Sequence, residues 1–249
     1  MKKTTSWRSV LFLLCMAGCV QFLMLSTVAM PLYSGGNYSD NSTPGYEFHQ
    51  NFFSDLGRTA AHNGASNTAS MVLLIIALSL AGLSLIVFFL AVLPHFAENR
   101  TARRLSIIGS TLGVISGIGF IGIAAVPADV NQTLHTNFVY VAFTGFLFVV
   151  FFYSAAILKS RMYPRVYAYA YLAFAVILAL YLVLLFSGPE LETTGGLTIQ
   201  AVGQKIVVYT GIICVVIQSW GAYQVERRRL PQHNSGPRQE NEMSGGRPG

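Results

Sequence analysis

The chain contains 249 residues, of which 53% are hydrophobic and only 10% are charged, and its mean hydropathy is +0.53. Soluble globular domains carry about 25% charged residues, so this composition excludes them and indicates an integral membrane protein. The formal net charge of +6 does not indicate nucleic-acid binding, because the basic residues lie beside hydrophobic runs, where they attract anionic lipid.

Six hydrophobic runs are long enough to cross a hydrocarbon core, which takes about 20 residues of helix. They fall near residues 9–31, 69–93, 105–126, 137–158, 166–187 and 206–225. The predicted fold class is all-α: a bundle of six transmembrane helices in one domain, residues 1–229. The segment 230–249 is rich in Pro, Gly, Ser and Asn, which predicts a disordered cytoplasmic tail. The first run is too long for the apolar part of a signal peptide, so we expect it to be retained as a span.

The basic residues predict which end of each helix faces the cytoplasm. All but two of the 16 Lys and Arg residues fall at alternate helix ends, so they share one side of the membrane. The positive-inside bias therefore places both termini in the cytoplasm and predicts a multi-pass protein of the cell membrane. One long outer loop, about residues 32–67, follows the first span. The two exceptions, Arg58 and Lys205, belong to the outer side.

Polar residues that can carry chemistry gather on this outer side, which also holds three of the five His residues. The set consists of His49, Ser54, Asp55, Arg58, His62, Asp129, His135 and Lys205. The candidate catalytic residues are His49, Ser54, Asp55 and His135. Ser54 would be a nucleophile beside a His, and Asp55 or Asp129 would orient His135 as a base.

The same residue types suit ligand binding. Asp and His are zinc ligands, so zinc is the candidate cofactor. Its candidate ligands are His62 and Asp129, together with His49, Asp55 and His135. Arg58 and Lys205 are candidate ligand-binding residues, because their cations hold phosphate or carboxylate groups, Arg through a bidentate fork.

Structural roles explain the same residues. Ser54 and Asp55 are common helix N-caps, and Lys205 flanks a span, where its long side chain reaches toward the surface. Asp129 and His135 stand at the ends of the third and fourth spans. The spacings HExxH and HxxxH do not occur in the sequence, so no motif supports a metal site.

Two functions therefore remain open. In the first, the outer polar cluster caps the bundle or binds a lipid headgroup or a partner, with Asp55, Arg58 and His135 forming a salt-bridged cap. In the second, the protein is an outer-leaflet lipid hydrolase with a His/Asp metal or acid–base site. Membrane lipids are the expected partners in both. Transport is disfavoured, because translocation paths need ionisable groups inside the spans.

Small residues recur in the third span. Gly109, Gly113 and Gly117 lie four positions apart and therefore share one helix face. Such faces let helices approach closely in a membrane. We interpret this face as a packing surface inside the bundle; the alternative is a homo-oligomer formed through it.

Several short motifs form a recognisable pattern. The first outer loop contains Pro44-Gly-Tyr46 and Phe53-Ser-Asp-Leu-Gly57, and Asn67 opens a span that contains Gly82. The Gly-rich third span ends in Ala125-Val-Pro127-Ala-Asp129, followed by Leu134-His135. This pattern resembles the domain-of-unknown-function family 998, six-span proteins of bacteria and archaea whose first outer loop reads PGY…ISELG or ISDLG. The likeness covers spans one to four and implies a six-span fold without an established activity.

Two further groups share features of the outer loop. The damage-regulated autophagy modulator group also has six spans and a Ser-Asp pair in the first outer loop, and is linked to membrane lipid organisation. The Pro-Glu pair that follows Ser-Asp in that group is missing here. The outer cluster is also similar in residue types to alkaline ceramidases, which hold zinc with an Asp and three His and use a Ser. Their paired-His helix motif is absent from this sequence.

Overall fold

The structure, a computed structural model, describes residues 6–233. These residues form six long helices: α1 (Trp7–Ala29), α2 (Thr68–Val92), α3 (Arg100–Ala125), α4 (Gln132–Lys159), α5 (Val166–Ser187) and α6 (Thr194–His233). Three short 3-10 helices accompany them: η1 (Met30–Leu32), η2 (Phe53–Gly57) and η3 (Leu93–Phe96). Each long helix is apolar over a length sufficient to cross a membrane. The all-α fold with six candidate spans is thereby confirmed.

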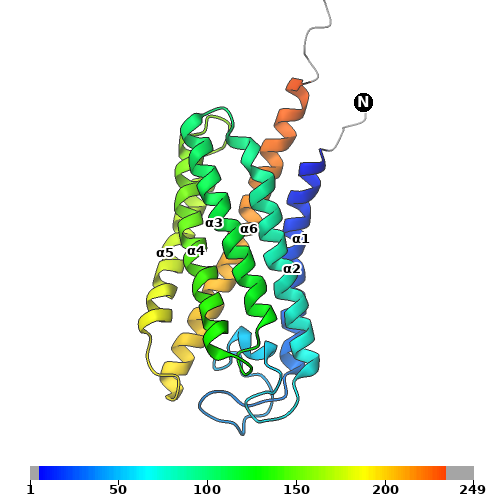
Figure 1. Ribbon diagram of the computed structural model, residues 1–249, viewed down its shortest axis with the longest axis vertical. Coiled ribbons are helices and arrows are strands. Elements are labelled where there is room, and N and C mark those ends of the chain that lie inside the picture. Colours follow the sequence, from blue (N-terminus) through cyan, green and yellow to red (C-terminus); the bar gives the residue numbers. More distant parts are fainter. Residues whose placement is uncertain (1–5, 234–249) are drawn as a thin grey trace, which may run out of the picture.

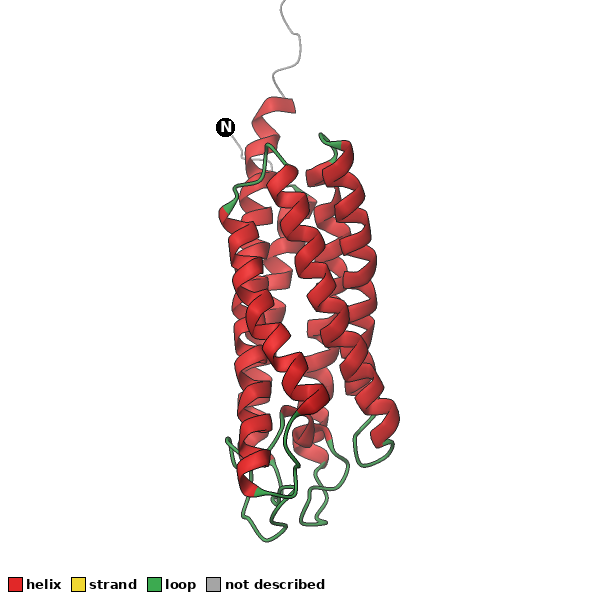
Figure 2. Cartoon of the chain, turned by 90° about the vertical axis from the view of Figure 1, so that its left-hand side faces the viewer, coloured by secondary structure: helices red, strands yellow, loops and turns green. Residues whose placement is uncertain are grey.

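The six helices form a ring in chain order (Figures 1 and 2). Each long helix packs against the next one along the chain, and α6 packs against α1 to close the ring. Helix α1 begins and α6 ends at one end of the ring, which we call the termini end. Residues 33–67 lie at the opposite end, which we call the loop end. Which end faces the cytoplasm stays a prediction from the charges.

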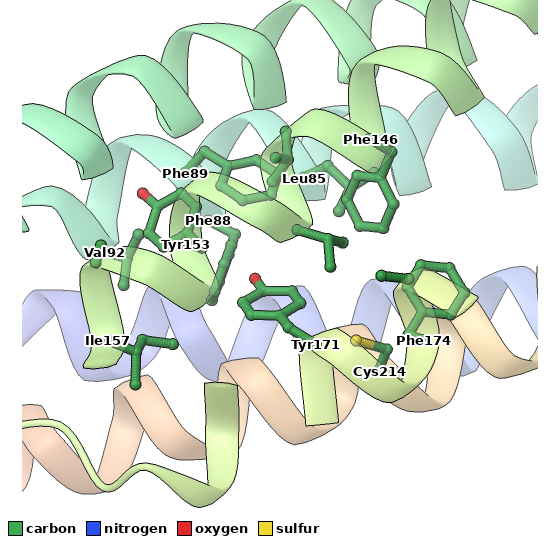
Figure 3. Close-up of a cluster of buried hydrophobic side chains, with 14 of the residues drawn as sticks. Leu85, Phe88, Phe89, Val92, Phe146, Tyr153, Ile157, Tyr171, Phe174 and Cys214 are labelled. Atoms are coloured by element: carbon green, nitrogen blue, oxygen red, sulfur yellow. The ribbon is translucent and has the colours of Figure 1, made fainter. Parts of the chain in front are cut away.

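Aromatic side chains fill much of the ring toward the termini end (Figure 3). The Phe89 ring lies 5.5 Å from the Tyr153 ring, and the Tyr153 ring lies 6.3 Å from that of Tyr171. The Ser110 hydroxyl donates to the carbonyl oxygen of Phe89 at 2.7 Å and also lies 2.6 Å from the Tyr153 hydroxyl. Tyr153 is therefore the donor in that pair, and its buried polar atom is satisfied without water.

The outward surface of the ring is apolar as well. Leu180 and Val183 of α5 are 67% and 66% exposed, and long apolar side chains of the other helices are exposed in the same way. An apolar surface of this kind suits contact with lipid tails, which are as apolar as the side chains themselves.

The glycine face of α3 packs inside the ring. A Cβ atom added at Gly109 would lie 2.8 Å from the Tyr153 ring of α4, and one at Gly117 would lie 2.7 Å from the Ile86 side chain of α2. At Gly113 it would meet the ring of Phe89. The packing interpretation is therefore confirmed. A homo-oligomer through the same face would have to displace these neighbours, which is the physical reason against it.

Helix α6 differs most from its predicted span. It begins at Thr194 rather than near residue 206, so most of the segment between the fifth and sixth predicted spans is helical. Leu197 and Ala201 of this extension are fully buried and four residues apart. Hydropathy misses the extension because polar residues such as Gln200 interrupt the apolar run. At the other end α6 reaches His233, so the first residues of the predicted tail 230–249 are helical, and residues 234–249 lie outside the described residues.

Replacing Gly113 with Ala tests the close approach of α2 and α3. We expect the thermal midpoint of the detergent-purified protein to fall, because overpacking costs about 1–3 kcal/mol, more than the helix propensity of about 1 kcal/mol that Ala adds. The matched control is Gly195→Ala in α6, where a Cβ meets nothing within 4 Å. A midpoint that is unchanged in Gly113→Ala would contradict this account of α3.

Candidate functional site

The loop between α1 and α2 folds back over the loop end. Gly35 and Gly36 have φ values of 118° and 80°, a region that favours glycine. A Cβ atom at Gly36 would lie 2.6 Å from the backbone nitrogen of Asn63, so these two segments of the loop approach too closely for a larger residue at position 36. The Asn63 amide nitrogen donates in turn to the carbonyl oxygen of Gly35 at 3.2 Å. The loop is thus a compact unit with its own hydrogen bonds.

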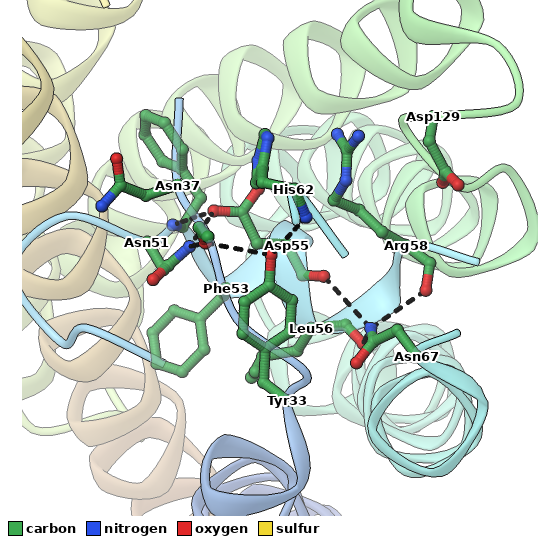
Figure 4. Close-up of polar contacts among 12 residues, drawn as sticks. Tyr33, Asn37, Asn51, Phe53, Asp55, Leu56, Arg58, His62, Asn67 and Asp129 are labelled. Carbon is green, nitrogen blue, oxygen red and sulfur yellow. Dashed lines mark hydrogen bonds and ion pairs between the residues drawn. The ribbon is translucent and has the colours of Figure 1, made fainter. Parts of the chain in front are cut away.

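Asp55 lies at the centre of this unit and is only 1% exposed (Figure 4). Its Oδ2 atom accepts from the Phe52 amide nitrogen at 2.8 Å and from Asn51 Nδ2 at 3.1 Å. Its Oδ1 atom lies 3.2 Å from His62 Nε2, which must be the donor because an ionised carboxylate only accepts. The Phe52 contact closes the first turn of η2, so this carboxylate holds the local fold together.

Helix α6 reaches into the loop with two buried polar side chains. The oxygen of Gln204 accepts from the Phe53 amide nitrogen at 2.7 Å. The Lys205 ammonium group donates to the carbonyl oxygen of Asn51 and lies 5.0 Å from the centre of the Phe48 ring. Lys205 is 2% exposed, so it does not extend to the surface as its flanking position suggested. Both contacts attach the loop to the ring.

Helix α2 and the α3–α4 connection hold the other side of the loop. The Asn67 side chain occupies the N-cap position of α2 but donates instead to the carbonyl oxygens of Leu56 and Arg58, both at 3.0 Å. Asp129 accepts from the amide nitrogens of Thr59 and Ala60 at 3.0 Å. Three separate segments, α6, the start of α2 and the α3–α4 connection, therefore converge on residues 51–60.

His135 and Arg58 lie near this cluster without joining an ion pair. His135 Nδ1 lies 2.7 Å from the carbonyl oxygen of Val126, the C-cap residue of α3. His135 therefore links the ends of α3 and α4, as its position in the sequence suggested. Arg58 Nε donates to the carbonyl oxygen of Ala60 at 3.1 Å.

The salt-bridged cap predicted for Asp55, Arg58 and His135 is wrong. Among the described residues, the ion-pair partner of Asp55 is His62, seven positions further along the same loop. Arg58 and His135 instead bond to backbone carbonyl oxygens. The donors to the buried Asp55 carboxylate are local, because the folded loop brings them within hydrogen-bond distance.

The candidate catalytic residues are not brought into one arrangement. His49 is exposed, and its ring packs edge-on against Phe48 at 5.5 Å. Within residues 6–233, Ser54 forms no hydrogen bond with a His side chain, and no group of three or more His, Cys, Asp or Glu residues is placed to hold a metal ion. Asp55 and His62 are the only two of the zinc candidates that contact each other in this part of the chain. The catalytic and zinc-binding roles stay predictions.

Two pKa values describe the chemistry that the cluster can perform. Burial, together with the nearby Asp55 carboxylate, raises the pKa of Tyr38 to about 12, so its hydroxyl remains protonated at neutral pH. Partial burial raises the pKa of Asp129, but hydrogen bonds from the Thr59 hydroxyl and from the Thr59 and Ala60 amides outweigh it and hold that pKa below 3.8. Asp129 is therefore an anion that binds the loop, and the neutral Tyr38 contributes its ring, which packs 4.5 Å from that of His62.

A second buried polar cluster lies at the termini end, and the sequence analysis missed it. His95 of η3 is fully buried, and its Nε2 atom lies 2.8 Å from Glu226 Oε2 of α6. The Ser6 hydroxyl donates to the other oxygen of Glu226 at 2.7 Å. The sequence does not indicate a partner for His95, because it lies alone in an apolar context. The available signal was Glu226, an acid directly before three Arg residues at the end of a span.

A cavity of about 110 Å³ lies inside the ring and is lined by all six helices. Its lining includes Cys19, Leu85, Phe120, Phe146, Phe174 and Val208. The hydroxyl of Ser84 also lines it but donates to the carbonyl oxygen of Leu80 at 2.8 Å within α2. Apolar cavities of about this size stay free of water and accept apolar molecules.

These features define a polytopic membrane protein: a ring of six candidate spanning helices with a partly open apolar cavity and a folded polar loop at one end. Residues 16–221 match the model of the family described as protein of unknown function (DUF998), so the chain belongs to this family. The family resemblance stated from the motifs is confirmed, and the match extends beyond the four spans that carried them. No match was found among curated proteins or among solved structures.

Replacing Asp55 with Asn tests its central role. The amide keeps one acceptor oxygen but turns an NH2 group toward a buried donor, which costs about 1–3 kcal/mol for each donor left unsatisfied. We expect a clearly lower thermal midpoint in detergent. Asp40→Asn is the matched control, because Asp40 is exposed in the same loop and its side chain accepts hydrogen bonds from Ser42 alone among the described residues. Equal midpoints for the two variants would show that Asp55 does not hold the loop.

The lowered pKa of Asp129 predicts the pH dependence of its contribution to stability. Because the folded-state pKa lies below the ordinary value of 3.8, the stabilisation is fully present above the unfolded-state pKa and disappears as pH falls through the folded-state pKa. The measurement is the difference in thermal midpoint between the wild type and Asp129→Asn over a pH series. We expect this difference to be constant above about pH 5 and to shrink below it. A difference that grows toward acid pH would contradict the assignment.

Proposed function

We propose that this chain is a lipid-binding protein of the cell membrane, which holds the apolar chain of a lipid inside its helical ring. In this proposal the polar cluster around Asp55 is a cap that closes the ring on the extracytoplasmic side. The observation that carries the proposal is the cavity of about 110 Å³ lined by side chains from all six helices. Because every helix contributes residues to its lining, the cavity is a feature of the whole ring and not of one poorly packed pair of helices.

The hydrogen bonds that the polar groups already make support a structural cap more than a reaction site. A site that binds or transforms a headgroup needs charged groups that are free to meet it. The Lys205 ammonium group is instead bonded to the carbonyl oxygen of Asn51, and both carboxylate oxygens of Asp55 accept hydrogen bonds from the loop.

The size and chemistry of the cavity favour a hydrocarbon chain as the occupant. Protein interiors are close-packed, so an unfilled void loses the dispersion contacts of its lining. Lipid tails surround the ring on all sides, and entering the cavity removes no polar group from water. A tail therefore gains packing without a desolvation cost.

The distribution of charge supports the proposed orientation. Of the basic residues in the described part of the chain, only Arg58 and Lys205 lie at the loop end. The termini end carries Arg8, Arg100, Arg103, Arg104, Lys159, Arg161, Arg165, Arg227, Arg228 and Arg229. The positive-inside bias then orients the termini end toward the cytoplasm and the capped end outward.

Photochemical cross-linking with a diazirine-labelled phospholipid tests this function. The label near the end of the acyl chain should react with cavity residues such as Cys19 and Val208, as well as with outward residues such as Leu180. Ala81 lines the cavity, and Ala81→Phe fills much of it. We expect this variant to lose the interior cross-links, read by peptide mass spectrometry, while the outward cross-links persist as an internal reference.

The matched control is Ala173→Phe, the same substitution at an exposed position of α5. It should leave both sets of cross-links unchanged. Thermal midpoints of both variants establish that they are folded. Interior peptides that remain unlabelled in the wild type, or equal interior labelling in the two variants, would refute the binding of a lipid chain in the cavity.

A further inference from the structure

The three consecutive Arg residues at the end of α6 have different surroundings. The Arg229 guanidinium donates to the carbonyl oxygen of Pro94 at 2.9 Å. The Arg227 guanidinium lies 5.6 Å from the centre of the Tyr223 ring. Arg228 is exposed and, within residues 6–233, makes neither a hydrogen bond nor an aromatic contact. Because successive helix positions point about 100° apart, each of the three faces a different direction.

Arg228 lines a groove of about 270 Å³ between α5 and α6. Trp220 and Gln224 line the same groove and precede Arg228 by eight and four positions, so the three form one stripe along α6. Pro164 and Tyr167, at the start of α5, form the opposite wall. No acidic residue belongs to the described lining, and Glu226 is instead engaged by His95 and Ser6. The groove is thus cationic.

The start of α5 adds to this positive character. The helix dipole places partial positive charge there. The amides of Tyr167, Ala168 and Tyr169 already donate to the carbonyl oxygens of Pro164 and Arg165, and Gln218 Nε2 donates to the carbonyl oxygen of Tyr167 at 2.8 Å, which fixes the wall. The groups of the groove that suit a phosphate are therefore the Arg228 guanidinium and the Gln224 side-chain amide.

The surface below the groove suits lipid chains. Trp220 is 47% exposed, and Ile213 and Ile217 continue the exposed apolar surface of α6 toward the middle of the membrane. Trp is typical of the interface between headgroups and hydrocarbon. A polar groove followed directly by an apolar surface is complementary to a phospholipid. Its phosphate would lie at the basic end of the helices and its tails beside them.

We propose that the groove between α5 and α6 at the termini end binds the phosphodiester of an anionic glycerophospholipid, with Arg228 as the main contact and Gln224 and Trp220 beside it. This site is separate from the cavity inside the ring. The positively charged termini end faces the leaflet that is richest in anionic lipid if it is cytoplasmic, which favours occupancy. The proposal does not depend on the cavity, because none of its residues lines it.

Native mass spectrometry of the full chain in mild detergent, titrated with phosphatidylglycerol, tests the site. We expect Arg228→Gln to weaken phosphatidylglycerol binding about tenfold, because a charge-assisted contact to the phosphate is lost. Gln224→Glu is a second variant: it keeps Arg228 but adds a carboxylate that repels the phosphate, so it should weaken binding similarly. Phosphatidylcholine should bind more weakly than phosphatidylglycerol to the wild type.

The matched control is Arg104→Gln in α3, which removes one exposed positive charge at the same end of the ring. It should change the affinity less than twofold. An equal loss in Arg104→Gln and Arg228→Gln would show that general surface charge attracts the lipid, which would overturn the proposal. Phosphatidylcholine binding as tight as phosphatidylglycerol binding would overturn it too.

Inorganic phosphate distinguishes a lipid from a free anion. We expect millimolar phosphate to leave the groove empty, so that adding it does not displace phosphatidylglycerol. Competition that disappears in Arg228→Gln would assign the groove to a free phosphate and overturn the lipid assignment. Loss of phosphatidylglycerol binding in Ala81→Phe, with Arg228 intact, would assign the lipid to the interior cavity instead.

Discussion

The buried carboxylate of Asp55 is the interaction on which the loop end depends. A charge that is 1% exposed is tolerated only when donors surround it, and the Phe52 amide, Asn51 and His62 supply them. These donors come from the same loop, so satisfying the charge also folds the loop. The folded loop then presents its backbone groups to α6, α2 and the α3–α4 connection, which attach it to the ring.

The ring itself depends on close contacts that carry no charge. Helices in lipid gain little from burying apolar surface, so the contact between α2 and α3 relies on the missing side chains of the α3 glycines. The larger residues opposite them, Phe89 and Tyr153, fill the space that the glycines leave. Large aromatic residues pack tightly toward the termini end, while the cavity remains where the side chains of six helices, which include both Phe174 and the small residues Ala81 and Gly211, do not fill the space.

The two ends of the ring are built from different polar elements. At the loop end, a long loop that has its own internal hydrogen bonds closes the ring. At the termini end, the short connection after α2 and the ends of α1 and α6 meet in the His95–Glu226 pair. Outside this pair, basic side chains dominate, and Arg228 faces a groove rather than a partner. A capped end and a basic end on one apolar ring suit a protein whose ligands are lipids.

The sequence by itself determined the membrane class, the six spans, the packing face of α3 and the family, because hydropathy, helical periodicity and short motifs are properties of single segments. It also singled out Arg58 and Lys205 as the two basic residues of the outer side, and Asp55 as a candidate site residue. Only the tertiary structure decided their partners. His62 rather than Arg58 pairs with Asp55, and His95 meets Glu226 across 131 positions. The early start of α6 escaped prediction for a related reason, since its polar residues Gln204 and Lys205 are buried by the loop and not by lipid. Partner choice depends on which donors burial brings within about 3 Å, and that distance is set by how the ring closes.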